Sequence, residues 1–276
     1  MRVLAMLDGS LADPDRPLLR ADDLGVQRGD GVFETVLVVD GRPRKLDAHL
    51  ERLARSAALL DLPEPDRAAW RRCAAAACAA WDGPPEMVLK LVLTRGVDGT
   101  GVPTAFALGT PVPELVLRQR REGVRVLALD RGYEAGTGER APWLLIGAKS
   151  LSYATNMAAQ RYARAHDADD VLFVSSDGWV LEAATASVVV AHGSVLRTPP
   201  ATAGLLPGTT QQQLFEAAEE AGWVTKVEPL RLDDVLSADG AWLVSSVRQL
   251  ALIRSVDGRP LRASTHDATL RELLRL

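Results

Sequence analysis

The strand-like and helix-like segments of this chain follow one another irregularly, and this order constrains its fold more than any other feature. Short segments rich in Val, Leu and Ala lie between amphipathic or Ala-rich segments of helical character. The regular alternation of strand and helix that indicates a parallel α/β sheet is missing. The order therefore predicts an α+β fold. The 276 residues are enough for one large domain or two smaller ones.

The first part of the chain is predicted to contain two helices and, besides a short strand at its start, three further strands. Leu50, Leu53, Ala57 and Leu60 recur at helical spacing after a potential capping residue, Asp47. The expected elements are a strand over Val32–Val39, a helix from Ala48 to about Leu60, an Ala-rich helix over Ala68–Trp81, and strands over Met87–Arg95 and Thr104–Leu108. Pro111-Val-Pro113 then marks a domain boundary, which divides the chain into residues 1–112 and 113–276.

The second part is predicted to combine a meander of short strands with three helices. The expected meander strands are Val171–Val174, Trp179–Leu181, Val188–Ala191 and Val195–Arg197. Further strands are expected over Val124–Leu129, Val224–Val227 and Ala241–Val244, and helices over Ala154–His166, Thr210–Ala221 and Ala268–Leu276.

Composition argues against several classes of function. A net charge near −4 and short, isolated basic clusters do not indicate nucleic acid as a main partner. Apolar runs are too short to span a membrane, and Met1–Asp8 has the pattern of a short strand rather than a signal peptide, so we expect a cytoplasmic protein. Cys73 and Cys78 lie five positions apart on a helix, and the four His residues are scattered. We therefore expect no disulfide and no catalytic metal.

The most informative single residue is Lys149, which follows the apolar stretch Leu144–Ile146. The chain uses Arg for nearly all its positive charge and contains only four lysines: Lys45, Lys90, Lys149 and Lys226. An amine loses its proton on burial and attacks carbonyl groups, whereas a guanidinium does not. Lys149 is therefore a candidate Schiff-base lysine. Lys90 is its rival, although a lysine on the solvated face of an amphipathic strand would look the same.

Three further places could bind a cofactor. The loop Leu206-Pro-Gly-Thr-Thr210 leads into a helix, whose first N–H groups suit a phosphate, although Thr209 or Thr210 would also serve as a simple N-cap. Arg52 lies at the edge of an apolar helix face and could bind a phosphate or extend over the core. Glu182 ends a strand and could pair with a protonated ring nitrogen, or be an ordinary exposed glutamate.

The order and spacing of these motifs together resemble the class IV aminotransferase family, the fold-type IV pyridoxal-phosphate enzymes. The resemblance extends from about Asp22 to Ile253. The motifs that carry it are Arg28-Gly-Asp-Gly-Val-Phe-Glu34, His49-Leu-Glu-Arg52-Leu, Leu93-Thr-Arg-Gly96, Lys149-Ser-Leu-Ser-Tyr153, Asp177-Gly-Trp-Val-Leu-Glu182 and Leu206-Pro-Gly-Thr-Thr210. It implies a small N-terminal α/β domain, a larger C-terminal domain with a β-barrel-like sheet, pyridoxal 5′-phosphate held between them, and a homodimer whose partner loops complete the site.

The resemblance also implies a role for each matching residue. Lys149 resembles the lysine that holds the cofactor aldehyde, and Glu182 the carboxylate at the pyridine nitrogen. Tyr153 matches a tyrosine near the phenolic oxygen of the cofactor. The residues that match phosphate ligands are Arg52, Thr209, Thr210 and Ser246. Five positions depart from the common pattern of the family, namely Ser152, Ala183, Ala186, Ser187 and Gln211.

Within the family, the chain is most similar to the 4-amino-4-deoxychorismate lyases, which release 4-aminobenzoate, a folate precursor, and pyruvate. Ser245-Ser-Val-Arg248 resembles their pattern, and Thr100-Gly-Val102 stands where the D-amino acid enzymes have an Arg-x-His carboxylate trap. Arg248 is a candidate for binding a substrate carboxylate or for a structural ion pair. The alternatives are an aminotransferase for D-amino acids or branched-chain L-amino acids, and a degenerate binding protein without enzymatic activity.

Overall fold

A computed structural model describes residues 1–275 and divides them into two compact units. The first unit comprises Met1–Pro113 together with Ala148–Tyr153, and the second comprises Glu114–Gly147 and Ala154 onward. The first division, after Pro113, lies one residue from the predicted boundary. The segment Ala148–Tyr153 differs from the prediction, because it belongs to the first unit although its flanking residues belong to the second.

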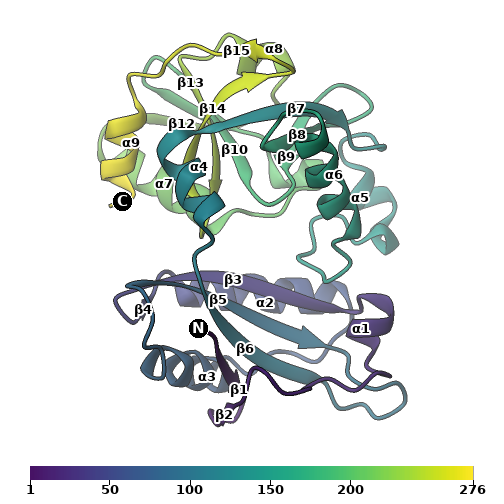
Figure 1. Cartoon of the computed structure of the whole chain (residues 1–276). Coiled ribbons are helices and arrows are strands. Elements are labelled where there is room, and N and C mark those ends of the chain that lie inside the picture. Colours follow the sequence, from purple (N-terminus) through teal and green to yellow (C-terminus); the bar gives the residue numbers. More distant parts are fainter. Residues whose placement is uncertain (276) are drawn as a thin grey trace. The chain divides into compact units, whose positions relative to one another are not determined.

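The first unit is a six-stranded sheet in the order β2-β1-β6-β5-β3-β4, with all neighbouring strands antiparallel (Figure 1). Helices α2 and α3 contact each other and pack against β3 and against β1 and β6, respectively. The elements are β1 (Val3–Met6), β2 (Leu11–Ala12), α1 (Leu24–Arg28), β3 (Gly31–Val39), β4 (Arg42–Pro43), α2 (Leu46–Leu59), α3 (Arg67–Ala79), β5 (Glu86–Thr94) and β6 (Thr104–Pro111).

The periodicity of α2 gives its packing correctly but not its start. Leu50, Leu53 and Ala57 are buried as the helical stripe predicts. The predicted cap, Asp47, is wrong: the helix begins at Leu46 after Lys45, which adopts the left-handed conformation, and Asp47 lies in the first turn. An acidic residue is still favourable there because it faces the positive end of the helix dipole. In α3, Asp66 is the N-cap and accepts hydrogen bonds from two backbone N–H groups.

The second unit is built on a nine-stranded sheet in the order β12-β11-β10-β13-β14-β7-β8-β9, with β15 paired to β14. Its strands are β7 (Val124–Asp130), β8 (Asp170–Val174), β9 (Val180–Ala183), β10 (Ser187–His192), β11 (Val195–Thr198), β12 (Val224–Val227), β13 (Gly240–Ser245), β14 (Gln249–Val256) and β15 (Arg259–Pro260). Its α-helices are α4 (Glu114–Glu122), α5 (Thr137–Arg140), α6 (Ala154–Ala165), α7 (Thr209–Glu220), α8 (Leu232–Leu236) and α9 (Asp267–Leu273).

The sheet of the second unit curls so that strands from distant places in the order share one core. Leu172 of β8 and Val180 of β9 pack in the same buried cluster as Val188 of β10 and Leu243 of β13. A second cluster joins β13 and β14 to α7 and α9, and a third joins β8 and β9 to α6. The predicted meander is correct only in part, because β8 and β9 form a hairpin but β10 pairs with β11 and β13. The predicted α+β class is confirmed.

Several elements were not predicted, among them α1, α4 and β14. The last predicted helix extends to Leu276, which lies outside the described residues; α9 ends at Leu273. Cys73 and Cys78 are free thiols, and burial raises the pKa of Cys73 to about 11, so that it stays protonated near neutral pH. Within residues 1–275, no helix has the length and apolar character needed to cross a membrane.

Candidate functional site

The residues predicted to carry the chemistry are divided between the two units. Lys149, Tyr153 and Arg52 belong to the first. The remaining predicted residues belong to the second, namely Glu182, Thr209, Thr210, Ser246 and Arg248.

The segment Ala148–Tyr153 is attached to the edge of β3 by backbone hydrogen bonds. The Phe33 N–H donates to the Lys149 carbonyl at 3.0 Å, and the Leu151 N–H donates to the Gly31 carbonyl at 2.8 Å. The Ser56 hydroxyl of α2 accepts the Lys149 N–H at 3.1 Å. Because these bonds fix the backbone on both sides of Lys149, its side chain starts from a defined position.

The Lys149 side chain is 9% exposed and lies against aromatic rings. Its Nζ is 4.3 Å from the centre of the Phe33 ring and 5.7 Å from that of Tyr153. The two rings meet edge to face at 5.3 Å, an arrangement that aromatic pairs prefer. Ring faces attract the ammonium form, while burial disfavours its charge. An amine that is held in place and little hydrated is the environment expected for a reactive lysine.

Gly31 permits the close approach of β5 and of the Leu151 side chain to β3, and we expect its replacement to displace the segment that carries Lys149. A Cβ atom at this position would lie 2.6 Å from the Leu93 carbonyl oxygen, 2.9 Å from Thr94 Cα and 2.8 Å from a Leu151 methyl. Since two of these atoms are backbone, Gly31→Ala should destabilise the protein by about 1–3 kcal/mol and lower its activity. Urea unfolding measures the first effect. Gly138→Ala, where the nearest atom is 3.4 Å away, is the control, and equal stability of the two variants would contradict the expectation.

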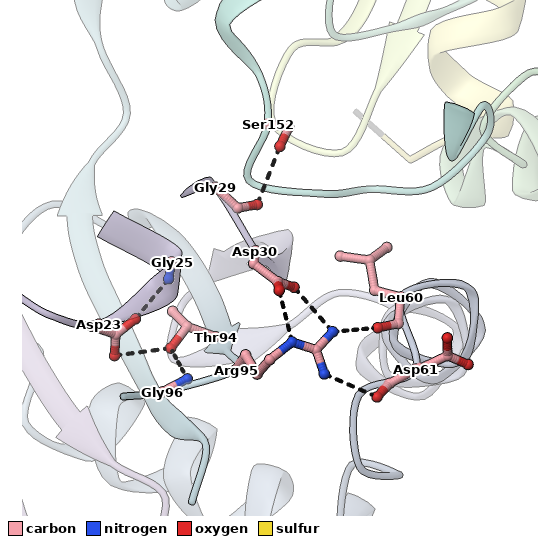
Figure 2. A network of polar contacts seen from close by, with 10 residues as sticks. All are labelled: Asp23, Gly25, Gly29, Asp30, Leu60, Asp61, Thr94, Arg95, Gly96 and Ser152. Atoms are coloured by element: carbon pink, nitrogen blue, oxygen red, sulfur yellow. Dashed lines mark hydrogen bonds and ion pairs between the residues drawn. The ribbon is translucent and has the colours of Figure 1, made fainter. Parts of the chain in front are cut away.

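A polar network holds the turn before β3 (Figure 2). Arg95 forms two hydrogen bonds with the Asp30 carboxylate, at 2.7 and 3.1 Å, and also donates to the Leu60 and Asp61 carbonyls at the end of α2. The Ser152 hydroxyl donates to the Gly29 carbonyl at 3.3 Å. The network thus links the turn, the end of α2 and the Lys149 segment.

Arg52 is held by the buried carboxylate of Glu34, for which the sequence predicted no role. Its Nε and Nη2 lie 2.7 and 2.8 Å from the two oxygens of Glu34, which is 0% exposed. His49 Nδ1 lies 2.7 Å from Glu34 Oε2. Burial alone would raise the pKa of Glu34, but the charge of Arg52 and the hydrogen bonds from Arg52 and His49 outweigh it and lower the pKa to about 2. Glu34 is therefore ionised at neutral pH and fixes the plane of the guanidinium.

In the second unit, a glycine precedes α7, so that the backbone at the start of this helix is not covered by a side chain of its own. The helix starts at Thr209 and is preceded by Gly208 as N-cap, which has no side chain with which to cap the first turn. A Cβ on Gly208 would come within 2.3 Å of the Ser187 hydroxyl and 3.2 Å of Gln211 Cβ. Two of the positions that depart from the family pattern, Ser187 and Gln211, thus border this glycine. The first N–H groups of a helix and its dipole favour an anion at such an end.

Glu182 lies in β9, where it is partly buried. Its Oε2 accepts the Leu206 N–H at 3.4 Å. Burial raises the pKa of Tyr133, the nearby Arg131 opposes this, and the charge of Glu182 adds to the rise. Arg131 lies 4.6 Å from the centre of the Phe173 ring. Glu182 therefore has a partly buried setting, in which a protonated ring nitrogen would be a favourable partner.

Arg248 takes part in a buried ion pair. Its Nη2 lies 2.7 Å from Asp170 Oδ2, and the two side chains are 8% and 0% exposed. Nη2 is also 3.5 Å from the Thr185 hydroxyl, whereas Nη1 is buried without a hydrogen-bond partner among the described residues. Ser246 lies in the turn between β13 and β14, two residues before Arg248. Of the two roles predicted for Arg248, the structure shows the ion pair; binding of a substrate carboxylate stays a prediction.

Sequence reasoning gave no role to Glu34, His49 and Asp170. A signal for Glu34 existed, because it is a single acidic residue within the apolar stretch Gly31–Val39. Asp170 gave no comparable signal, since its partner is distant in the sequence. Within residues 1–275, no group of His, Cys, Asp and Glu side chains could hold a metal ion.

Comparisons with known proteins identify the family. The family model for amino-transferase class IV matches residues 31–256. A bifunctional aminodeoxychorismate lyase / D-amino acid transaminase from Mycobacterium tuberculosis is 46% identical over 94% of this chain and 93% of its own length.

Two solved structures share the whole fold. A hypothetical aminotransferase from M. tuberculosis in its PLP-bound form has a TM-score of 0.97 at 45% identity, covering 100% of this chain and 98% of that one. The fold IV-transaminase CpuTA1 from Curtobacterium pusillum has a TM-score of 0.94 at 45% identity, with both chains fully covered. The predicted family and two-domain fold are confirmed. The chain belongs to the class IV aminotransferase family.

Proposed function

We propose that this chain is a pyridoxal 5′-phosphate-dependent 4-amino-4-deoxychorismate lyase that releases 4-aminobenzoate and pyruvate. The observation that carries the proposal is the similarity, over nearly the whole length of both proteins, to the M. tuberculosis protein named for this activity. The pattern Ser245-Ser-Val-Arg248 gives independent support from the sequence.

The described residues fit pyridoxal phosphate, which the PLP-bound relative also carries. Arg52 donates its Nε and Nη2 hydrogens to Glu34. These two bonds fix the plane of the guanidinium, which is a planar donor group suited to a phosphate. At the start of α7, Gly208 carries no side chain, and a Cβ there would collide with the Ser187 hydroxyl, so the backbone N–H groups of this helix end stay accessible to an anion. We assign the phosphate to Arg52, Thr209, Thr210 and Ser246, the ring nitrogen to Glu182, the phenolic oxygen to Tyr153, and the aldehyde to Lys149.

When bound, the cofactor supplies an aldehyde that condenses with amines and a protonated ring that withdraws electrons from the substrate. Lys149 Nζ then acts as the general base and removes the proton from C4 of the substrate. The electrons of that C–H bond form the new ring double bond as the bond from C3 to the enolpyruvyl oxygen breaks. Lys149 can return its proton to the departing enolpyruvate, so that pyruvate and the aromatic 4-aminobenzoate are formed without an oxidant.

D-Amino acid transamination is the second candidate, because the name of the M. tuberculosis relative includes it. Both reactions need the same proton removal by Lys149. They differ in where the proton goes next: in transamination it is added to the cofactor rather than to a leaving group. One protein could therefore perform both reactions with the same residues.

Product analysis tests the proposal. Purified protein loaded with pyridoxal phosphate should convert aminodeoxychorismate to fluorescent 4-aminobenzoate and an equal amount of pyruvate. Transfer of amino groups between D-amino acids and keto acids, without any 4-aminobenzoate, would reject the lyase and favour the transaminase. The homodimer stays a prediction from the sequence.

A further inference from the structure

A tight turn of the second unit carries Ser246, one of the residues assigned to the cofactor phosphate. The turn joins β13, which ends at Ser245, to β14, which begins at Gln249. These two residues pair with each other across the turn. Gln249 has a φ of 62°, in the left-handed region that residues with a side chain disfavour. A strained turn of this kind keeps one shape only where the surrounding structure holds it.

Arg120 of α4 holds the carbonyl of the residue after Ser246. Its Nε and Nη2 both donate to the Val247 carbonyl oxygen, at 3.0 and 2.6 Å. Hydrogen bonds from a charged donor are stronger than those between neutral groups, so this contact fixes the Val247 carbonyl. Because Val247 is joined directly to Ser246, the backbone that carries the Ser246 hydroxyl is restrained as well.

Arg271 of α9 holds the backbone of Arg120 in turn. Its Nη2 donates to the Arg120 carbonyl at 2.7 Å and to the Leu250 carbonyl at 3.1 Å. Its Nε donates to Asp267 at 2.7 Å, and the other oxygen of Asp267 accepts the N–H of the buried Trp242 indole at 2.9 Å. These bonds join α4 and α9 to β13 and β14 (Figure 1), the two strands that the turn connects.

The turn has a second anchor that is independent of α4 and α9. Arg248 pairs with Asp170 of β8 at 2.7 Å, and both side chains are buried. Loss of the Arg120 guanidinium should therefore release the Val247 carbonyl while Arg248 still attaches the turn to the sheet. The effect of Arg120 on the turn can thus be measured in a folded protein.

We propose that Arg120 is a positioning residue for the cofactor phosphate and that Arg271 supports it. The inference rests on the proposed function, which assigns the phosphate to Ser246 among other residues. Ordering a loop when a ligand binds costs free energy, and a loop that is held beforehand avoids this cost. Arg120 holds the turn in advance through Val247. It acts through the backbone of the turn rather than by contact with the phosphate.

Titrations with pyridoxal phosphate and with pyridoxal isolate this effect, because pyridoxal is the same molecule without the phosphate. Both are measured by calorimetry on the full-length protein freed of cofactor. Arg120→Met keeps an apolar stem but removes the donors. It should raise the Kd for pyridoxal phosphate about 10-fold, the lower end of the range for a hydrogen bond with a charged group, and the Kd for pyridoxal less than about twofold. Arg120→Lys keeps a charged donor and should restore part of the affinity.

The matched control is Arg121→Met, at the next position of α4, where an exposed arginine pairs with Glu114 at 3.0 Å. Its affinity for both ligands should equal that of the wild type. Arg271→Met should weaken pyridoxal phosphate binding by a smaller factor than Arg120→Met, because Arg271 reaches Val247 only through Arg120.

A double variant tests whether Arg120 acts through the turn. In the Ser246→Ala background, Arg120→Met should raise the Kd for pyridoxal phosphate less than about threefold, because the ligand that it positions is already missing. Equal affinity of wild type and Arg120→Met for pyridoxal phosphate, equal losses for both ligands, or a fully additive double variant would overturn the proposal. These titrations need no turnover, so they decide on Arg120 even if the protein makes no 4-aminobenzoate and the lyase fails.

Discussion

Lys149→Ala should reduce turnover by at least about 10⁴-fold, because one substitution removes both the covalent attachment point and the general base. Borohydride treatment of the cofactor-loaded wild type, followed by peptide mass spectrometry, should place the reduced cofactor on Lys149. The variant should show no labelled peptide. Lys149→Arg should be equally inactive, since a guanidinium keeps the charge but not the nucleophile.

The rival lysine provides the decisive comparison. Lys90→Met should keep the label on Lys149, whereas Lys226→Met, a change at an exposed residue, should alter neither label nor turnover. Label on Lys90, or more than about a tenth of wild-type activity in Lys149→Ala, would show that Lys149 has been given the wrong role.

Glu34→Ala should be the most destabilising of the substitutions considered, costing about 3–5 kcal/mol, because it leaves the Arg52 charge buried without its partner. Urea unfolding measures the loss. The matched control is Glu51→Ala on the same helix as Arg52, where an exposed pair with Arg67 at 3.6 Å should contribute about 0–1 kcal/mol. If the unpaired charge is the cause, Arg52→Met in the Glu34→Ala background should recover part of the stability; a purely additive further loss would speak against it.

The same carboxylate should give stability a defined dependence on pH. The pKa of Glu34 is lowered from 4.5 to about 2, so that the folded state holds the proton less well than the unfolded chain. Its contribution, about 3 kcal/mol, is therefore complete above pH 4.5 and is lost as the pH falls towards 2. Between pH 5 and pH 3, Glu34→Gln should lose less stability than wild type in urea unfolding. Equal losses would mean that other groups control acid unfolding.

Sequence periodicity predicted those helices whose buried side chains recur at regular spacing. The α2 stripe of Leu50, Leu53 and Ala57 was correct because helical periodicity is carried by neighbouring residues. Helix α4 was missed because Gln119 is its only buried residue, so its sequence shows mainly the basic cluster of its exposed side. The start of α2 was wrong because Lys45 adopts a left-handed conformation that its residue type does not indicate.

The site required contacts between residues far apart in the chain. Ser56 and Lys149, which hydrogen-bond to each other, are 93 positions apart. Similarity to a family supplied the roles of Lys149, Arg52 and Glu182, but not the carboxylate that holds Arg52. Glu34 and Arg52 are 18 positions apart and meet only because β3 and α2 pack together. The sequence likewise did not show that Asp170 is the ion-pair partner of Arg248, because the two residues lie on different strands far apart in the chain.

The path of the chain through its two units limits how this protein could be divided. The backbone leaves the first unit after Pro113 and returns for six residues, Ala148–Tyr153, before leaving it again. A single cut therefore yields no pair of fragments that each contain one whole unit. A fragment ending at Pro113 would leave the Phe33 N–H and the Gly31 carbonyl of β3 without their bonds to the returning segment. The segment that carries Lys149 thus makes the first unit discontinuous in sequence. The two units could be encoded as separate domains only if the chain were reconnected in a different order.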